Sequence, residues 1–170
     1  AGFACFGSIS ELVSDLNSHS EEEVVQLVQK RYKGIQLLRK LLGDKAIGFE
    51  QHGGHELFLK DRPELFESCM NQIDVLNEVL HPVFGDAPFK KTKNIFGFGK
   101  IQGQYITHKF EGQLDTGKMM KALLQKCHDA QIPILNGIEV KNIQDEGEKA
   151  LIVTEDFEFE SKKVFVATNG

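Results

Sequence analysis

Several residue types that define particular protein classes are scarce in this sequence. Its 170 residues include no tryptophan, four prolines and three cysteines, which argues against collagen-like and disulfide-framed folds. No apolar run approaches the roughly 20 residues of a membrane-spanning helix, and no basic segment followed by an apolar one opens the chain like a secretory signal. Cys5, Cys69 and Cys127 are odd in number and widely spaced. We therefore expect reduced thiols and a cytoplasmic protein without a transmembrane segment.

A surplus of positive charge is missing as well. The sequence has 20 Lys and Arg against 25 Asp and Glu, which gives a net charge of -5. A basic cluster between Lys90 and Lys100 is offset elsewhere by acidic runs such as 21–23, so we expect no nucleic-acid partner. The overall composition, with 41% hydrophobic and 26% charged residues, is typical of a globular chain that is long enough to bury a sizeable core.

The first half of the sequence predicts amphipathic helices. Two Ser-x-x-Glu patterns, at Ser8 and Ser20, are typical of capping boxes, and Pro63 suits a first helical residue. A tight hairpin is expected at Gly53-Gly54, because two glycines supply the positive φ angles that such a turn demands. The predicted helices cover 9–16, 21–42 and 61–81, and the hairpin strands cover 47–51 and 55–59.

The second half predicts a loop, one helix and several strands. Residues 84–100 are rich in Phe, Gly, Pro and Lys and are expected to be irregular. Asp115 is placed to cap a helix over 118–130, with Met120, Leu123, Leu124 and Cys127 on its buried side. The predicted strands cover 104–110, 132–135, 138–143, 150–154, 157–160 and 164–167. The expected fold is therefore α+β, with amphipathic helices and a β-hairpin joined to a mixed β-sheet.

The last predicted strand ends in a turn of small residues, Ala167-Thr168-Asn169-Gly170. Such residues let a bulky ligand lie against the backbone, as at the carboxyl end of a strand in a nucleotide-binding α/β sheet. A domain rarely stops on a buried strand, because unpaired backbone and apolar surface are both costly there. We expect the chain to be cut from a larger protein.

The order of elements from Gly112 to Gly170 resembles the middle of the FAD-dependent amine and D-amino-acid oxidoreductases, which include glycine oxidase and the D-amino-acid dehydrogenases. In that family a Gly-Gln-x-Asp-Pro turn opens a helix, a later strand supplies a Val to the adenine side of FAD, and an Ala-Thr-(Gly/Asn)-Gly turn lies beside the cofactor. Thr116 stands where the family usually has Pro. The matching residues are Gly112, Gln113, Asp115, Val140, Ala167, Thr168 and Gly170.

The amino terminus fits the same resemblance. Ala1-Gly2-Phe3 resembles the stretch after the Arg-Asn-Ala-Gly segment that family members place near the flavin ring. The resemblance implies a helical cap and substrate-side region with a hairpin over 1–102, and the central part of an interrupted FAD-binding region over 103–170. The residues that it implies as cofactor contacts are Ala1, Gly2, Val140, Ala167, Thr168 and Gly170.

The activity that the resemblance implies is oxidation of a small amine or amino acid by hydride transfer to FAD. The sequence contains no Gly-x-Gly-x-x-Gly, the fingerprint that places a pyrophosphate on a helix amino terminus. We therefore expect an internal fragment that is inactive by itself, in which the catalytic residues are unassigned. Substrate identity and the electron acceptor, oxygen or another, stay open.

Two glycine-rich segments have simpler interpretations than nucleotide binding. Gly97 to Gly103 resembles a dinucleotide loop, but its last spacing is one residue too long, so a flexible aromatic loop is predicted. Gly112 to Lys118 meets the spacing of a phosphate-binding loop, but Met119 replaces the hydroxyl residue that would hold Mg²⁺. A helix cap at Asp115 and a solvated Lys118 account for the second segment.

Other polar residues are also assigned no metal or catalytic role. His52 and His55 would face each other across the predicted hairpin, but a zinc site usually needs a third protein ligand, so no metal site is expected. Cys127 and His128 are adjacent on a helix, so their side chains diverge and no dyad is predicted. Tyr105 is either a substrate contact in the cap or a sheet-surface aromatic.

A competing interpretation needs no cofactor. The amphipathic helices would then belong to a self-contained α+β module for protein interaction or ligand binding, and the flavin resemblance would be accidental. In either case an exposed sheet edge is able to pair with a second copy of the chain.

Overall fold

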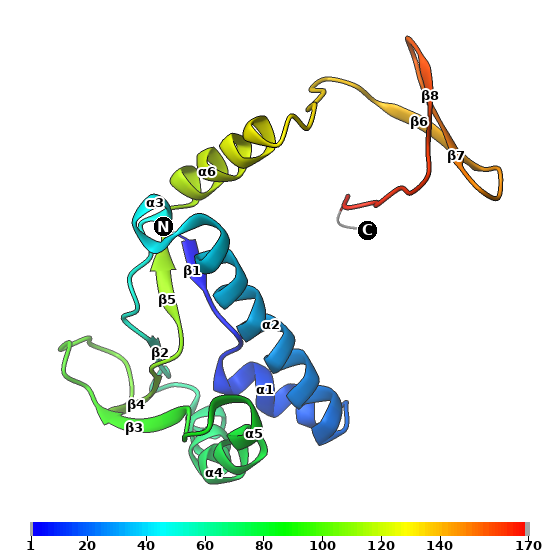
Figure 1. Ribbon diagram of the computed structural model, residues 1–170. Coiled ribbons are helices and arrows are strands. Elements are labelled where there is room, and N and C mark those ends of the chain that lie inside the picture. Colours follow the sequence, from blue (N-terminus) through cyan, green and yellow to red (C-terminus); the bar gives the residue numbers. More distant parts are fainter. Residues whose placement is uncertain (1, 169–170) are drawn as a thin grey trace. The chain divides into compact units, whose positions relative to one another are not determined.

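The computed structural model describes residues 2–168 and divides into two compact units, residues 1–126 and 127–170 (Figure 1). The described part has an α+β fold with six helices and three small antiparallel sheets. The boundary predicted after residue 102 lies in the loop between β3 and β4 of unit 1. No helix within residues 2–168 is both long and apolar enough to cross a membrane.

The helices begin and end largely where local sequence signals place them. Ser8 Oγ accepts a hydrogen bond from the backbone N–H of Glu11, and Ser20 and Glu23 form a complete capping box. Gly43 directly follows the last residue of the longest helix, and Pro63 is the first residue of the second-longest helix. The helices are α1 (Ile9–Leu16), α2 (Glu21–Leu42), α3 (Asp44–Ile47), α4 (Pro63–Val79), α5 (His81–Phe84) and α6 (Thr116–Asp129).

Two of the sheets belong to unit 1. In the first, β1 (Gly2–Ala4) pairs with β5 (Gly112–Leu114). The second has the order β2-β4-β3, with β4 (Gln104–His108) between β2 (Gly54–Glu56) and β3 (Phe89–Lys93). All of these pairings are antiparallel.

Unit 2 contains the third sheet, a meander of three antiparallel strands. Its strands are β6 (Val140–Asp145), β7 (Ala150–Thr154) and β8 (Glu158–Ser161). The mixed sheet expected from the sequence is therefore absent from residues 2–168, in which every paired strand is antiparallel to its neighbour.

The predicted hairpin around Gly53-Gly54 is wrong. β2 pairs with β4 rather than with residues 47–51. A Cβ atom at Gly53 would collide with the backbone of His108, and one at Gly54 would collide with its ring. The two glycines are needed for this close approach between distant segments, not for a tight two-strand turn.

Two predicted strands are also wrong, at 132–135 and 164–167. Neither segment forms a ladder with another described strand. Ile132 and Leu135 are 55% and 62% exposed, and Phe165 is 90% exposed. A strand needs a hydrogen-bonding neighbour, which β-type composition alone does not supply.

The buried face of helix α6 agrees with the prediction only in part. Leu123 and Cys127 are half-buried, but Met120 and Leu124 are 52% and 51% exposed. Met119 and Ala122 pack against buried residues of unit 1 instead. Asp115 Oδ1 accepts a hydrogen bond from the N–H of Lys118 at 2.9 Å, so the predicted cap is confirmed.

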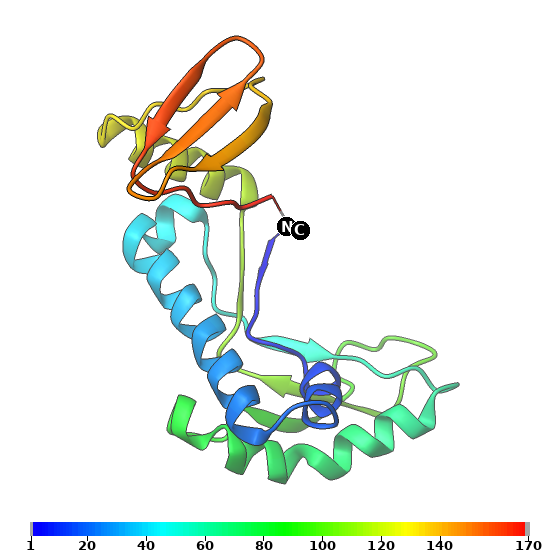
Figure 2. The same cartoon turned by 90° about the vertical axis from the view of Figure 1, so that its right-hand side faces the viewer.

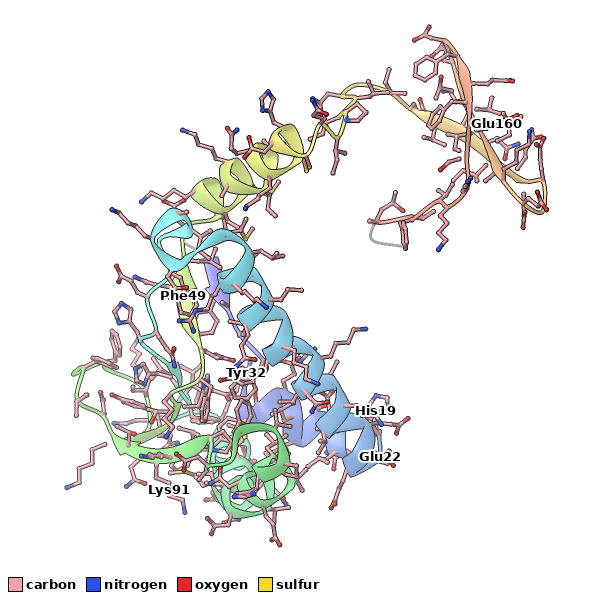
Figure 3. The ribbon with its side chains drawn as sticks, in the orientation of Figure 1. His19, Glu22, Tyr32, Phe49, Lys91 and Glu160 are labelled. Carbon is pink, nitrogen blue, oxygen red and sulfur yellow. The ribbon has the colours of Figure 1, made fainter. Side chains whose placement is uncertain are left out.

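Unit 1 has two apolar clusters, on different parts of α2. Tyr32 borders the larger cluster and Phe49 belongs to the smaller one (Figure 3). The larger is built from Phe6, Ile9, Leu12, Val24, Val28, Phe58, Cys69, Ile73, Leu76, Leu80, Phe89 and Ile106, and the smaller from Ala4, Ile35, Ile47, Phe49 and Leu114. The helices and strands of unit 1 therefore pack around two separate apolar clusters.

Candidate functional sites

Three residues singled out in the sequence lie together in unit 2. Val140, Ala167 and Thr168 line one open cavity of about 350 Å³. The remaining lining residues are Ile143, Ile152, Phe159, Ser161, Lys163, Val164, Phe165 and Val166. We call this the β6–β8 cavity.

One wall of the β6–β8 cavity is a row of apolar side chains across the meander. Ile143 lies opposite Ile152, and Ile152 lies opposite Phe159, so the three side chains share one face of the sheet. Ile152 is 4% exposed, whereas Ile143 and Phe159 are 41% and 45% exposed. The segment from Lys163 to Thr168 lines the cavity without joining the sheet.

Polar groups in this cavity are few. Ser161 Oγ donates a hydrogen bond to the carbonyl oxygen of Lys163 at 2.8 Å, which anchors the start of the lining segment. The hydroxyl group of Thr168 and the ammonium group of Lys163 are the other side-chain polar groups in the lining. An apolar cavity with a small number of polar groups is the usual composition of a small-molecule site.

The other predicted cofactor contacts lie elsewhere or outside the described residues. Ala1 and Gly170 fall outside residues 2–168. Gly2 lies in β1 of unit 1, opposite Leu114. A Cβ atom at Gly2 would lie 2.6 Å from Thr116 Cγ2 and 2.8 Å from Leu114 Cδ1. Close packing against Leu114 and Thr116 therefore accounts for a glycine at this position without any ligand.

The turn that precedes α6 is closed by its own hydrogen bonds. The N–H of Gln113 donates to Glu50 O at 3.0 Å, and the N–H of Met119 donates to Asp115 O at 2.9 Å. With the Asp115–Lys118 cap and the N–H of Asp115, which donates to Ile47 O at 2.9 Å, these bonds occupy four amides between Gln113 and Met119. The interpretation of Asp115 as a helix cap therefore fits the geometry.

A buried acid–base pair in unit 1 was not singled out in the sequence. His108 Nε2 lies 3.3 Å from Glu111 Oε2, and the two side chains are only 4% and 1% exposed. The second carboxylate oxygen, Glu111 Oε1, accepts hydrogen bonds from the N–H groups of Phe6 at 2.7 Å and Gly7 at 3.3 Å. Glu111 therefore fixes the segment that leads from β1 to α1.

The imidazole of His108 is held mainly by aromatic rings. Its centroid lies 5.2 Å from that of Phe6 and 5.6 Å from that of Phe89. Its Nδ1 atom has no hydrogen-bond partner among the described residues. One sequence signal could have identified this pair. Glu111 is an isolated acidic residue directly before Gly112, and it follows His108 by three residues at the end of a β-type run.

Burial shifts both groups of the pair toward their neutral forms. Removal from water raises the pKa of Glu111 from 4.5 to about 7, although its two backbone hydrogen bonds act in the opposite direction. Desolvation, with a smaller contribution from His55, lowers the pKa of His108 from 6.5 to about 4. Between these limits the pair holds one proton, and a proton on the carboxyl group avoids two buried charges.

The two histidines of the expected turn line one small cavity, but each also contacts a different neighbour. His52 Nε2 lies 2.7 Å from Glu50 Oε2, while the ring of His55 packs against Phe96 and Tyr105. No three potential His, Cys, Asp or Glu ligands gather anywhere in residues 2–168. Tyr105 is fully buried rather than a surface aromatic.

Comparisons with known proteins supply no relative for this chain. No protein-family model, curated protein or solved structure matches it. The β6–β8 cavity and the His108–Glu111 pair must therefore be interpreted from their own geometry and chemistry.

Proposed function

We propose that this chain supplies part of the FAD-binding site of an oxidoreductase that acts on a small amine or amino acid. The observation that carries the proposal is the gathering of Val140, Ala167 and Thr168 around one apolar cavity. The sequence resemblance selected these residues from two segments that are distant along the chain. Residues that form one wall of a cofactor site must line the same cavity, as these three do.

The cavity suits the adenine end of the cofactor. Its volume of about 350 Å³ lies within the range of small-molecule sites. The cross-strand row of Ile143, Ile152 and Phe159 offers apolar surface to the face of a flat ring. Thr168 adds a hydroxyl group that is able to donate or accept a hydrogen bond.

The pyrophosphate of FAD needs groups that the described residues do not offer. The sequence contains no Gly-x-Gly-x-x-Gly, and in the turn before α6 the amides of Gln113, Asp115 and Lys118 donate to protein oxygens. Most of the affinity for a dinucleotide comes from that cradle and the helix that follows it. We therefore propose weak cofactor binding and no catalytic activity for the 170 residues alone.

The chemistry of the proposed oxidation would come from the cofactor. When bound, FAD would supply the acceptor for the hydride that leaves the substrate. The protein would hold the cofactor and orient the substrate.

The proposal is tested by equilibrium dialysis of the chain against AMP and against FAD. Val140→Glu places a charge in the lining of the β6–β8 cavity and is expected to weaken binding of both nucleotides at least tenfold. Leu135→Glu is the matched control, because Leu135 is 62% exposed, lies in the same unit and does not line the cavity. Equal losses in both variants, or no binding of AMP at millimolar concentration, would contradict the proposal.

A second assay separates an oxidoreductase from a cofactor-free binding module. A longer protein that contains this chain should purify with flavin absorbance at the protein peak in gel filtration. A colourless product that cannot be reconstituted with FAD would favour the cofactor-free alternative.

A further inference from the structure

Unit 1 contains a hairpin whose charge is opposite to that of the whole chain. β3, β4 and their connecting loop lie in a segment, 87–110, that has no Asp or Glu, while the chain has a net charge of -5. Its five lysines are all exposed. They are Lys90, Lys91, Lys93, Lys100 and Lys109. Lys91, in β3, is labelled in Figure 3. Lys109 forms an ion pair with Asp86, and Lys90 lies near enough to Asp86 to lower its pKa.

The end of this hairpin exposes large apolar side chains. Ile95 is 71% exposed, Phe98 is 53% exposed and Phe96 is 50% exposed. Leu59, which is 48% exposed, lies beside them because it forms a β-bridge with Ile101. We call these four exposed side chains, Leu59, Ile95, Phe96 and Phe98, the tip patch.

The loop that carries the tip patch has a defined internal structure. Asn94 Oδ1 accepts from the N–H of Gly97 at 3.1 Å, and Asn94 Nδ2 donates to Phe98 O at 3.0 Å. The ring of Phe96 stacks on Tyr105 with centroids 5.8 Å apart and planes 6° apart. These contacts order the backbone of the loop and one face of Phe96, while the side chains of Ile95 and Phe98 stay exposed.

Backbone hydrogen bonds join this loop to the neighbouring segment. The N–H of Gln102 donates to Phe58 O at 2.8 Å, and the N–H of Lys60 donates to Lys100 O at 3.0 Å. In Figure 2 the loop between β3 and β4 extends beyond its sheet on the side away from α2. The tip patch is therefore a preformed projection with lysines on its flanks.

We propose that the tip patch and its lysines dock on the surface of an anionic phospholipid membrane. Aromatic and aliphatic side chains at a projecting end are able to enter the boundary between headgroups and acyl chains. Lysines beside them would meet the negative headgroups while their methylene stems cover apolar surface. The charge of the hairpin matches this surface, whereas a second copy of the hairpin would repel it.

A lipid surface fits the tip patch better than a nucleic acid does. Single-stranded nucleic acids are bound by free aromatic faces on which bases stack. One face of Phe96 is already against Tyr105, and Ile95 and Leu59 have no ring. Burial of aliphatic side chains in a lipid boundary contributes far more binding free energy than their contact with a nucleic-acid base does.

The absence of tryptophan from the sequence provides a direct test. Phe98→Trp places a single tryptophan in the tip patch, and Leu37→Trp places one on α2, where Leu37 is 55% exposed. Vesicles of phosphatidylcholine with 30% phosphatidylglycerol should shift the emission of Phe98→Trp to the blue, and brominated acyl chains should quench it. Leu37→Trp should show neither change, and pure phosphatidylcholine should have little effect on either variant.

Flotation with the same vesicles, without a tryptophan label, measures how much the apolar side chains and the lysines each contribute to membrane binding. Ile95→Ser combined with Phe98→Ser should reduce binding at least tenfold, while Leu37→Ser should not. Lys91→Gln and Lys93→Gln should each reduce binding by about fivefold, an effect that salt diminishes. The proposal is overturned if anionic vesicles do not bind at low salt, if the double Ser variant binds normally, or if a single-stranded oligonucleotide alone shifts the Phe98→Trp emission.

Discussion

The two units differ in how they use apolar residues. Unit 1 buries two clusters between its helices and sheets, and residues such as Phe6 and Leu76 are completely enclosed. In the meander of unit 2, Ile152 is the one hydrophobic residue that is fully buried, while Val140 and Ile143 are 50% and 41% exposed. Unit 1 therefore has a core of its own, whereas the apolar face of unit 2 gains most from an occupant.

The difference gives unit 1 and unit 2 different sensitivities to mutation. A core residue is surrounded by atoms that cannot collapse into the space left by truncation. A half-exposed residue in an open cavity leaves no sealed void. Truncation to Ala should therefore lower the free energy of unfolding more in unit 1 than in the lining of the β6–β8 cavity.

The largest effect on folding is expected in the major cluster of unit 1. Leu76→Ala removes a fully buried side chain and should lower the free energy of unfolding of that unit by about 3 kcal/mol. Val140→Ala in unit 2 should cost less than about 1 kcal/mol, because Val140 is half exposed. Urea unfolding followed by circular dichroism measures both. A similar loss in the two variants would erase the contrast between the units.

The next largest effect concerns the His108–Glu111 pair and its pH dependence. The folded pKa of Glu111, about 7, lies above 4.5, so ionisation of Glu111 makes stability fall as pH rises from 4.5 to 7. The folded pKa of His108, about 4, lies below 6.5, so His108 makes stability rise between pH 4 and 6.5. The two slopes oppose each other, and the pair adds little pH dependence between 4.5 and 6.5.

Removal of one member should reveal the slope of the other. Glu111→Gln keeps an oxygen for the Phe6 and Gly7 amides, and its stability should rise with pH between 4 and 6.5 by about 1.4 kcal/mol per unit. His108→Gln should show a falling stability between pH 4.5 and 7. Unfolding curves at pH 4.5, 5.5 and 6.5 measure both slopes. Identical pH profiles for the two variants would contradict the shared-proton account.

A smaller effect is expected at the capping box of α2. Ser20→Ala removes the side-chain oxygen that accepts from the N–H of Glu23 and should cost unit 1 about 1 kcal/mol. The same variant should leave AMP binding at the β6–β8 cavity unchanged, since it alters only a helix end. A change in nucleotide affinity with this variant would link α2 to binding in a way that the proposal does not include.

Local signals in the sequence predicted the helices well. The side-chain cap at Ser8, the capping box at Ser20, the proline at position 63 and the cap at Asp115 each act within one turn of chain. Strand pairing depends on distant partners and was predicted poorly. Gly53 and Gly54 suggested a local turn, but the structure needs glycine at both positions because His108 lies too close for a Cβ atom.

The candidate sites show the same limit. The gathering of Val140, Ala167 and Thr168 was anticipated because a resemblance linked them across the chain. The role of Glu111 was not anticipated, because Phe6, whose backbone N–H donates to it, lies 105 residues away in the sequence. A polar residue in a strand-like run has no visible partner in sequence, so only the fold distinguishes a buried pair from a solvated one.

The central claim is that the β6–β8 cavity binds the adenine end of FAD. Its most direct test is a titration of the chain with AMP, followed by NMR of its isoleucine and valine methyl groups. We predict shifts for Val140, Ile143 and Ile152, with Ile35 and Ile73 of the unit 1 clusters unchanged. Unshifted cavity methyls at saturating AMP, or shifts confined to unit 1, would contradict the account.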